Sequence, residues 1–238
     1  YEETDWEFIK RLASRFNVGL MPLGADDGAN IIFGIKNGKD MGNIEEYKYT
    51  LEKDVKNYLI SKENYNESLL ELDSIRFKIE TIENIDVYSK IKYQDFDLYI
   101  GKKRAFLKDG ILKFEYEICT KKGLTRNRFY NDKIIGLSIK GKVLKPIQDR
   151  IKVHLEIDEN QEENTAWEFL YSTMYTAEGN SGWYCMPEID DTVYIYFPTK
   201  EESEGVGTSS LRIGDKGTDK VNEPSIKYFR TIDGKEIK

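Results

Sequence analysis

The chain has 238 residues, of which 39% are hydrophobic, and this is enough apolar material for one or two ordinary cores. Its mean hydropathy is −0.62 and no apolar run approaches the length of a membrane span, so we expect a folded, soluble protein. The 36 basic and 43 acidic side chains leave a net charge of −7, which argues against nucleic acid as a partner. Because the chain starts at Tyr1 within an organised pattern, we expect it to be a piece of a longer polypeptide.

The first predicted element is an amphipathic helix at about residues 5–16. Thr4 precedes Glu7 by three residues, which is the pattern of a capping box. We expect the apolar stripe of this helix to dock on the core of its own domain, because that is the usual fate of such a face. The stripe consists of Trp6, Ile9, Leu12, Ala13 and Phe16.

From Val18 to about residue 72 the pattern indicates short strands joined by turns, with one ambiguous segment. Residues 51–64, LEKDVKNYLISKEN, have a mixed periodicity that suits either a helix or a strand. Turns are expected in GADDGAN and NGKDMGN, where Gly and Asp gather. The strand patterns, which are short and aromatic or β-branched, are VGLMPL, NIIFGIK and EEYKYTL.

A clean alternation of apolar and polar residues returns between residues 74 and 120. It is seen in SIRFKIETI and in DLYIGKKRAF and GILKFEYEICT, which flank the turn LKDG. The pattern predicts an antiparallel barrel or sheet.

The polar and basic segment KKGLTRNRFYNDK, residues 121–133, has little periodicity and is expected to link two domains. After it, five short strands follow within about 80 residues, and this spacing predicts a small closed barrel of the OB type. The five strand patterns are IIGLSIKGKVLKP, DRIKVHLEID, AWEFLYSTMY, DTVYIYFP and SSLRIG.

The inventory of reactive side chains does not favour catalysis. Cys119 and Cys185 lie far apart in strand-like apolar contexts, so we expect two buried thiols and neither a disulfide nor a metal site. His154 alternates with apolar residues, which places it on the outer face of a strand. A glycosidase-type pair among the 43 acidic residues stays open, but the linker is too short for an inserted enzyme domain. We therefore expect no enzyme and no catalytic, cofactor-binding or metal-binding residues.

Two segments resemble the VgrG and phage late control protein D family, the central spike of contractile injection systems. Residues 1–12, YEETDWEFIKRL, are similar to that family's helix Y-x-E-[ST]-D-W-x-F. Residues 182–197 contain its tight Gly turn, an aromatic residue and PE-x-x-D-x-V leading into a strand. One departure is Asp190, which stands where the family commonly has Gly, so Asp190 itself would have to adopt the left-handed turn.

The resemblance implies a mainly β fold with one N-terminal amphipathic helix. Residues 1–133 would form a tail-hub, β-barrel-like region that lacks the family's upstream barrel. Residues 134–215 would form an OB-fold-like barrel at the base of the spike. Residues 216–238 would begin the needle, or β-helix, segment.

The resemblance also implies a function as a homotrimer that joins the tail tube to the membrane-piercing needle. The partners would be tube, baseplate and needle-tip proteins, with mechanical contact to the target envelope. The place would be a phage tail, contractile bacteriocin or related particle that is assembled in the bacterial cytoplasm. The isolated chain is expected to be a monomer or a concentration-dependent trimer, because the flanking parts would supply much of the association energy.

Within the predicted barrel, Trp183 to Met186 are expected to form wall and core, and Pro187 a corner without strand structure. Val193, Ile195 and Phe197 would pack inward. The opposite face, with Thr192, Tyr194 and Tyr196, would meet a neighbouring chain or solvent.

Two other functions stay open. A free OB-fold protein would bind single-stranded nucleic acid or an oligosaccharide through its aromatic side chains. The aromatic residues that would bind the ligand are Trp183, Tyr184, Tyr194 and Tyr196. The second alternative is a tail-associated peptidoglycan hydrolase.

Overall fold

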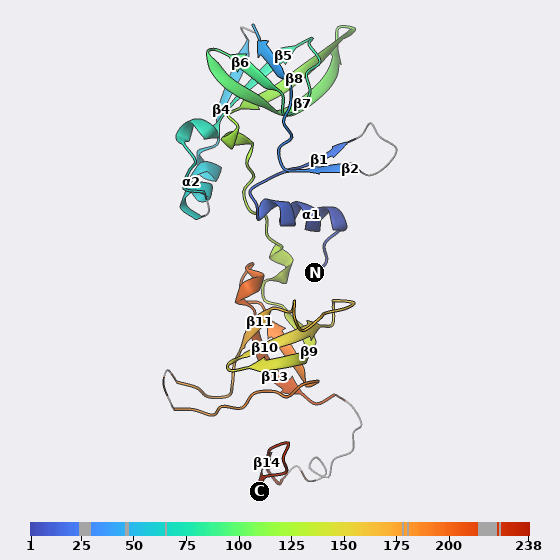
Figure 1. Cartoon of the computed structure of the whole chain (residues 1–238), viewed down its shortest axis with the longest axis vertical. Coiled ribbons are helices and arrows are strands. Elements are labelled where there is room, and N and C mark those ends of the chain that lie inside the picture. Colours follow the sequence, from blue (N-terminus) through green and yellow to red (C-terminus); the bar gives the residue numbers. More distant parts are fainter. Residues whose placement is uncertain are drawn as a thin grey trace. The chain divides into compact units, whose positions relative to one another are not determined.

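The computed structural model describes residues 1–23, 30–45, 48–64, 66–177, 179, 181–213, 223 and 225–238. The chain divides into two compact units, Tyr1–Asn131 and Asp132–Lys238 (Figure 1). The division falls within the segment that the sequence marks as a linker, residues 121–133.

In its described residues, the first unit contains two α-helices, a two-stranded hairpin and a six-stranded sheet. Helix α1 is followed by strands β1 and β2, which pair antiparallel. The sheet has the order β3-β6-β7-β8-β5-β4, and all its neighbours are antiparallel except β3 and β6. The bounds are α1 Asp5–Ser14, β1 Leu20–Leu23, β2 Asn30–Phe33, β3 Asp40–Asn43, β4 Tyr49–Lys53, α2 Val55–Asn64, η1 Glu71–Ser74, β5 Ile75–Thr81, β6 Lys90–Tyr93, β7 Phe96–Lys108, β8 Ile111–Cys119 and η2 Lys122–Leu124.

One face of the sheet is buried, in agreement with the predicted alternation of apolar and polar residues along its strands. Tyr116 lies at the centre of this core, and burial raises the pKa of its phenol. Its hydroxyl donates to the Glu83 carbonyl at 2.8 Å and accepts from the Ile85 N–H at 2.7 Å, so the buried polar atom is satisfied. The core residues are Phe77, Ile79, Ile85, Ile91, Tyr93, Leu98, Ile100, Phe114, Tyr116 and Ile118.

Three local expectations are decided by the structure. Residues 55–64 form the helix α2, which settles the ambiguous segment and adds a second helix. Residues 40–43 form β3 and not a turn, because β6 supplies hydrogen bonds; the Lys90 N–H donates to the Lys39 carbonyl at 2.8 Å. The expected turn between β7 and β8 is confirmed, with Asp109 and Gly110 both at positive φ. The turn expected at residues 24–30 lies mostly outside the described residues.

The second unit holds the predicted small barrel, and its five strands close on themselves. The order is β10-β11-β13-β12-β9, with β9 pairing both β10 and β12 antiparallel and β11 running parallel to β13. The chain therefore has a mainly β fold that ends in an OB-fold-like barrel. The bounds are η3 Asp132–Ile134, β9 Ser138–Ile147, β10 Arg150–Leu155, β11 Glu168–Tyr171, β12 Thr192–Tyr196, η4 Glu202–Glu204, β13 Val206–Leu211, β14 Phe229–Arg230 and β15 Glu236–Ile237.

Side chains fill the barrel interior. Phe169 and Phe197 meet edge to face with ring centroids 6.0 Å apart, and the aliphatic residues of β9, β10 and β12 pack around them. The buried cluster is Ile134, Ile139, Val143, Ile151, Val153, Phe169, Val193, Ile195 and Phe197. Of the segment expected to start a needle, residues 216–222 and 224 lie outside the described residues, and β14 and β15 pair near its end.

We expect Gly141→Ala to destabilise the barrel by about 1–3 kcal/mol through overpacking. A Cβ at this position would meet Val153 Cγ1 and lie 2.7 Å from the His154 carbonyl oxygen. Urea unfolding measures the loss. Ser138→Ala, at an exposed position of the same strand, is the control and should change the free energy of unfolding by less than about 0.5 kcal/mol. Equal stability of the two variants would contradict the close approach of β9 and β10.

Candidate functional site

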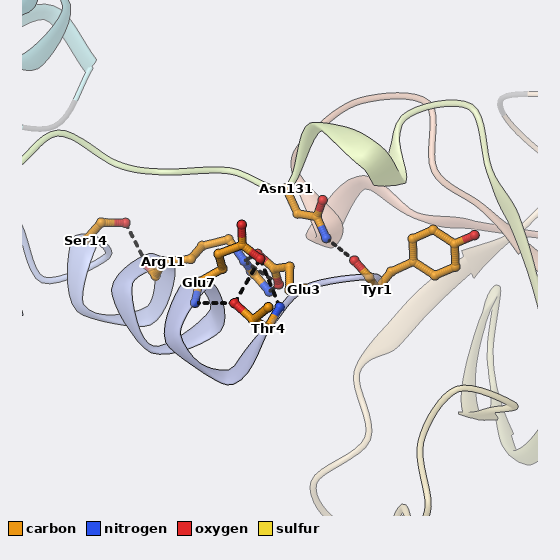
Figure 2. A network of polar contacts seen from close by, with 7 residues as sticks. All are labelled: Tyr1, Glu3, Thr4, Glu7, Arg11, Ser14 and Asn131. Carbon is orange, nitrogen blue, oxygen red and sulfur yellow. Dashed lines mark hydrogen bonds and ion pairs between the residues drawn. The ribbon is translucent and has the colours of Figure 1, made fainter. Parts of the chain in front are cut away.

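Helix α1 is fixed at its start by the polar network in Figure 2. The Glu7 N–H donates to Thr4 Oγ1 at 3.3 Å, and Glu7 Oε2 accepts from the Thr4 N–H at 2.9 Å, so the predicted capping box is confirmed. Arg11 donates through Nε and Nη2 to both oxygens of Glu3, with Nη2 to Oε2 at 2.7 Å. This two-point ion pair lowers the pKa of the Glu3 carboxyl.

The polar side of α1 also attaches to the segment that ends the first unit. Ser14 Oγ donates to the Arg11 carbonyl at 2.6 Å and accepts from the Phe129 N–H at 2.9 Å. The Asn131 amide donates to the Tyr1 carbonyl at 2.6 Å (Figure 2). Arg11, Ala13 and Ser14 are therefore the buried residues of the helix.

The expectation that the predicted stripe of α1 docks on its own domain's core is wrong for Trp6, Leu12 and Phe16, which are exposed, whereas Ile9 is half-buried and Ala13 is buried. Phe8, Leu12 and Phe16 recur every four residues and lie on one face. The Phe16 ring meets Phe33 of β2 edge to face at 6.0 Å, and Ile31 lies two residues before Phe33 on the same side of that strand. We call these five residues the α1–β2 apolar face; they are between 40% and 67% exposed. Their exposure follows from the polar attachment, which uses the other side of the helix.

On the barrel, the two faces of β12 are as predicted, apart from Thr192. Val193, Ile195 and Phe197 are buried. On the outer face Tyr194 is half-buried and Tyr196 is 40% exposed. Thr192 is buried because it lies directly between Lys142 and Leu211 on the neighbouring strands, whose side chains share its face.

The segment from Trp183 to Met186 does not form the wall and core of the barrel. Trp183 and Tyr184 are 63% and 72% exposed, because the connection between β11 and β12 leaves the barrel before returning. The Trp183 N–H donates to the Tyr175 carbonyl at 2.8 Å, which closes a small loop outside the barrel. The Tyr184 hydroxyl donates to the Gln148 carbonyl in the turn between β9 and β10 at 2.5 Å, and Met186, half-buried against the core, and the buried Pro187 return to the barrel. Pro187 lies outside the strands, as expected.

The turn before β12 has the geometry predicted from its sequence. Asp190 adopts φ 69°, the left-handed conformation that a Gly would take without strain. Its N–H donates to the Val143 carbonyl at 2.9 Å, and the Val143 N–H donates to the Asp191 carbonyl at 2.9 Å. Asp191 also accepts from the Glu188 N–H at 2.9 Å. These bonds tie the turn to β9 and offset the cost of a left-handed Asp.

Cys119 and His154 lie where the sequence predicts, whereas Cys185 does not. Cys119 is buried, and burial raises the pKa of its thiol, whereas Cys185 is exposed because it lies in the loop outside the barrel. His154 lies on the outer side of β10, half-buried, with Nε2 2.8 Å from the Asp158 carbonyl oxygen. Within the described residues, no three His, Cys, Asp or Glu side chains gather as metal ligands would. No helix in the described part is long and apolar enough to cross a membrane.

Comparison with family models and with curated proteins finds no match for this sequence. Among solved structures, the chain is similar to one described as "The E. coli c3393 protein is a component of the type VI secretion system and exhibits structural similarity to T4 bacteriophage tail proteins gp27 and gp5". The TM-score is 0.55 at 11% sequence identity, and the match covers 89% of this chain and 61% of that chain. This chain therefore shares its fold with a secretion-system component that is itself similar to phage tail proteins.

We expect Glu3→Gln to lower the free energy of unfolding by about 1–3 kcal/mol at neutral pH, because Arg11 loses a charged partner that is only 12% exposed. A lowered pKa in the folded chain contributes stability that is complete above the ordinary Glu value of roughly 4.3 and is lost as the pH falls through the folded value. The difference between the two proteins should therefore shrink below about pH 4. Urea unfolding across the pH range measures it, with Glu159→Gln on an exposed loop as the control.

Thiol labelling should distinguish the two cysteines. In the folded chain, a chromogenic disulfide reagent should modify Cys185 within minutes and leave Cys119 unmodified until denaturant is added. Cys185→Ser should remove the fast phase alone. A fast phase that persists in this variant would contradict the burial of Cys119.

Proposed function

We propose that this chain is a structural hub or spike component of a contractile injection apparatus, and that it joins the tail tube to the needle as a homotrimer. The observation that carries the proposal is the match over 89% of the chain to a type VI secretion component that is similar to the tail proteins gp27 and gp5. The chain spans 61% of the length of that structure. That it performs the role of a whole hub is therefore part of what we propose.

Features of this chain support the same role independently. The Y-x-E-[ST]-D-W pattern begins a helix with a complete capping box, and PE-x-x-D-x-V leads into β12 through the left-handed Asp190. The α1–β2 apolar face gathers five exposed apolar side chains, and contiguous patches of this kind are often functional.

The proposed mechanism is mechanical. A closed barrel has no free sheet edge, so it can bear load without exposing strands that pair with other chains. In a trimer, three barrels would hold the root of the needle, and buried interface area would supply the association energy. The role requires no reaction, so we propose that the chain is not an enzyme and acts with tube, baseplate and needle proteins of a tail-like particle.

Sedimentation velocity over a hundredfold concentration range tests the proposal. Of the two states expected for the isolated chain, a monomer or a concentration-dependent trimer, the proposed homotrimer requires the second, and a strict monomer throughout would count against it. Tyr196→Ser should raise the trimer dissociation constant about 5- to 50-fold if the outer face of β12 meets a neighbour. Ile157→Ser, at a residue of similar exposure after β10, is the matched control and should leave the dissociation constant within about twofold.

One observation favours a second candidate, a free OB-fold binding protein. Trp183, Tyr184 and Tyr175 are exposed on the loop outside the barrel, where they offer stacking surfaces for bases or sugars. The acidic net charge of −7 opposes nucleic-acid binding. Fluorescence anisotropy with a labelled single-stranded oligonucleotide at low salt decides between them, and micromolar binding that Trp183→Ala abolishes would favour this candidate.

A further inference from the structure

The segment between β2 and β3 contains Asn37–Gly38, the one place in the sequence where Gly follows Asn. Residues 35–39 form neither helix nor strand, and both residues of the pair are exposed. Among the described residues, neither the Asn37 side-chain amide nor the Gly38 N–H has a hydrogen-bond partner. No hydrogen bond of the described fold therefore restrains either group.

The fold requires Gly at position 38. A Cβ there would collide with the carbonyl oxygen of Tyr88 and the backbone nitrogen of Ser89. That facing backbone is itself held in place, because the Tyr88 N–H donates to the Ile100 carbonyl at 2.8 Å and the Ile100 N–H donates to the Ser89 carbonyl at 3.1 Å. Since Gly has no side chain, its peptide nitrogen is the one that a preceding Asn side chain reaches with least hindrance. The packing thus keeps beside Asn37 the residue that shields its own nitrogen least.

The side chain of Asn37 has space in which to turn. Asn37 and Gly38 lie on the wall of a surface hollow of about 480 Å³, together with Val87, Ser89 and Lys103. Bringing Asn37 Cγ to the Gly38 nitrogen requires only rotation about the bonds of Asn37, and an exposed connecting segment permits such rotation.

We propose that Asn37 is a site of spontaneous deamidation and that the product of this reaction releases strand β3. The Gly38 nitrogen attacks Asn37 Cγ and loses its proton to solvent. The new N–Cγ bond closes a five-membered succinimide ring as the Cγ–Nδ2 bond breaks, and the amide nitrogen leaves as ammonia. This inference is independent of the proposed assembly role.

Water then opens the ring at either of its two carbonyl groups, and no other reactant is needed. Opening at Cγ leaves an aspartate with the original main chain. Opening at the other carbonyl leaves an isoaspartate, in which the main chain runs through Cβ and Cγ of the former Asn. The second product changes both the charge and the length of the backbone.

The isoaspartate lengthens the main chain by one carbon immediately before β3. The Lys39 carbonyl accepts from the Lys90 N–H at 2.8 Å, and the Ile44 N–H donates to the Lys92 carbonyl at 3.1 Å, so these two bonds hold the ends of β3 beside β6. Gly38 lies between the added carbon and the first of these bonds, where it has no spare room. We therefore expect the Lys39–Lys90 bond to break, which leaves β6 with an unpaired edge.

Peptide mass spectrometry of the ageing protein tests the reaction. The folded chain is kept at about 37 °C in mildly alkaline buffer, digested, and searched for the gain of about 1 Da that accompanies the exchange of an amide for a carboxyl group. Deamidation at Asn37 should be at least about tenfold faster than at Asn160, which is also exposed outside the helices and strands but precedes Gln161. Enzymatic methylation of isoaspartate distinguishes the two products.

Two outcomes of this measurement overturn the inference. One is an equal rate at Asn37 and Asn160 in the folded chain. The other is a rate at Asn37 in urea more than about fivefold above the folded rate, because the fold would then block the attack. Asn37→Gln should stay unmodified, since its ring would have to be six-membered and closes far more slowly.

Hydrogen exchange tests the effect on β3. In the isoaspartate form, the Lys90 N–H should exchange at least about fivefold faster than in fresh protein, whereas Ile118 in the central strand β8 should stay within about twofold. Freshly prepared Asn37→Asp is the matched control, because it carries the new charge without the added main-chain carbon. Exchange as fast in this variant as in the aged protein overturns the release by isoaspartate, and so does modification without faster exchange at Lys90.

Discussion

The attachment of helix α1 by its polar side is the constraint on which the exposed apolar face of the first unit depends. The Arg11–Glu3 ion pair and the bonds of Ser14 and Asn131 hold the helix against the start and the end of the unit. Both members of the ion pair are nearly buried, at 9% and 12% exposure, so the loss of either would leave a charge without a partner away from water. With the polar side used in this way, Phe8, Leu12 and Phe16 have no place inside the unit.

The barrel obeys a different constraint, which is closure. β9 pairs with β10 along one edge and with β12 along the other, and a bulge at Lys152 and Val153 accommodates the curvature. At Gly141 β9 lies close to β10, since a side chain there would run into Val153 and the His154 carbonyl. The left-handed Asp190 then brings the chain back to β9 at the start of β12.

Together these constraints leave exposed apolar side chains in the described parts of both units. The chain's lone His154 lies on the outer side of a strand, and its exposed thiol lies in a loop outside the barrel. Exposed apolar side chains gather in the α1–β2 apolar face and in the loop around Trp183.

The sequence by itself determined the elements whose cause lies within a few residues. The capping box of Thr4 and Glu7, the turn at Asp109 and Gly110 and the alternation along β12 are of this type. They depend on local hydrogen bonds and backbone sterics, which neighbouring residues control.

Only the tertiary structure decided which of these surfaces are covered. The strand β3 forms because β6 offers it hydrogen bonds from 50 residues away in the chain. Trp183 and Cys185 are exposed because their loop leaves the barrel, although their sequence is as apolar as a core strand. The periodicity of α1 predicts an apolar face but does not show which segment, if any, covers that face. Burial depends on segments distant in the chain, and no local pattern records them.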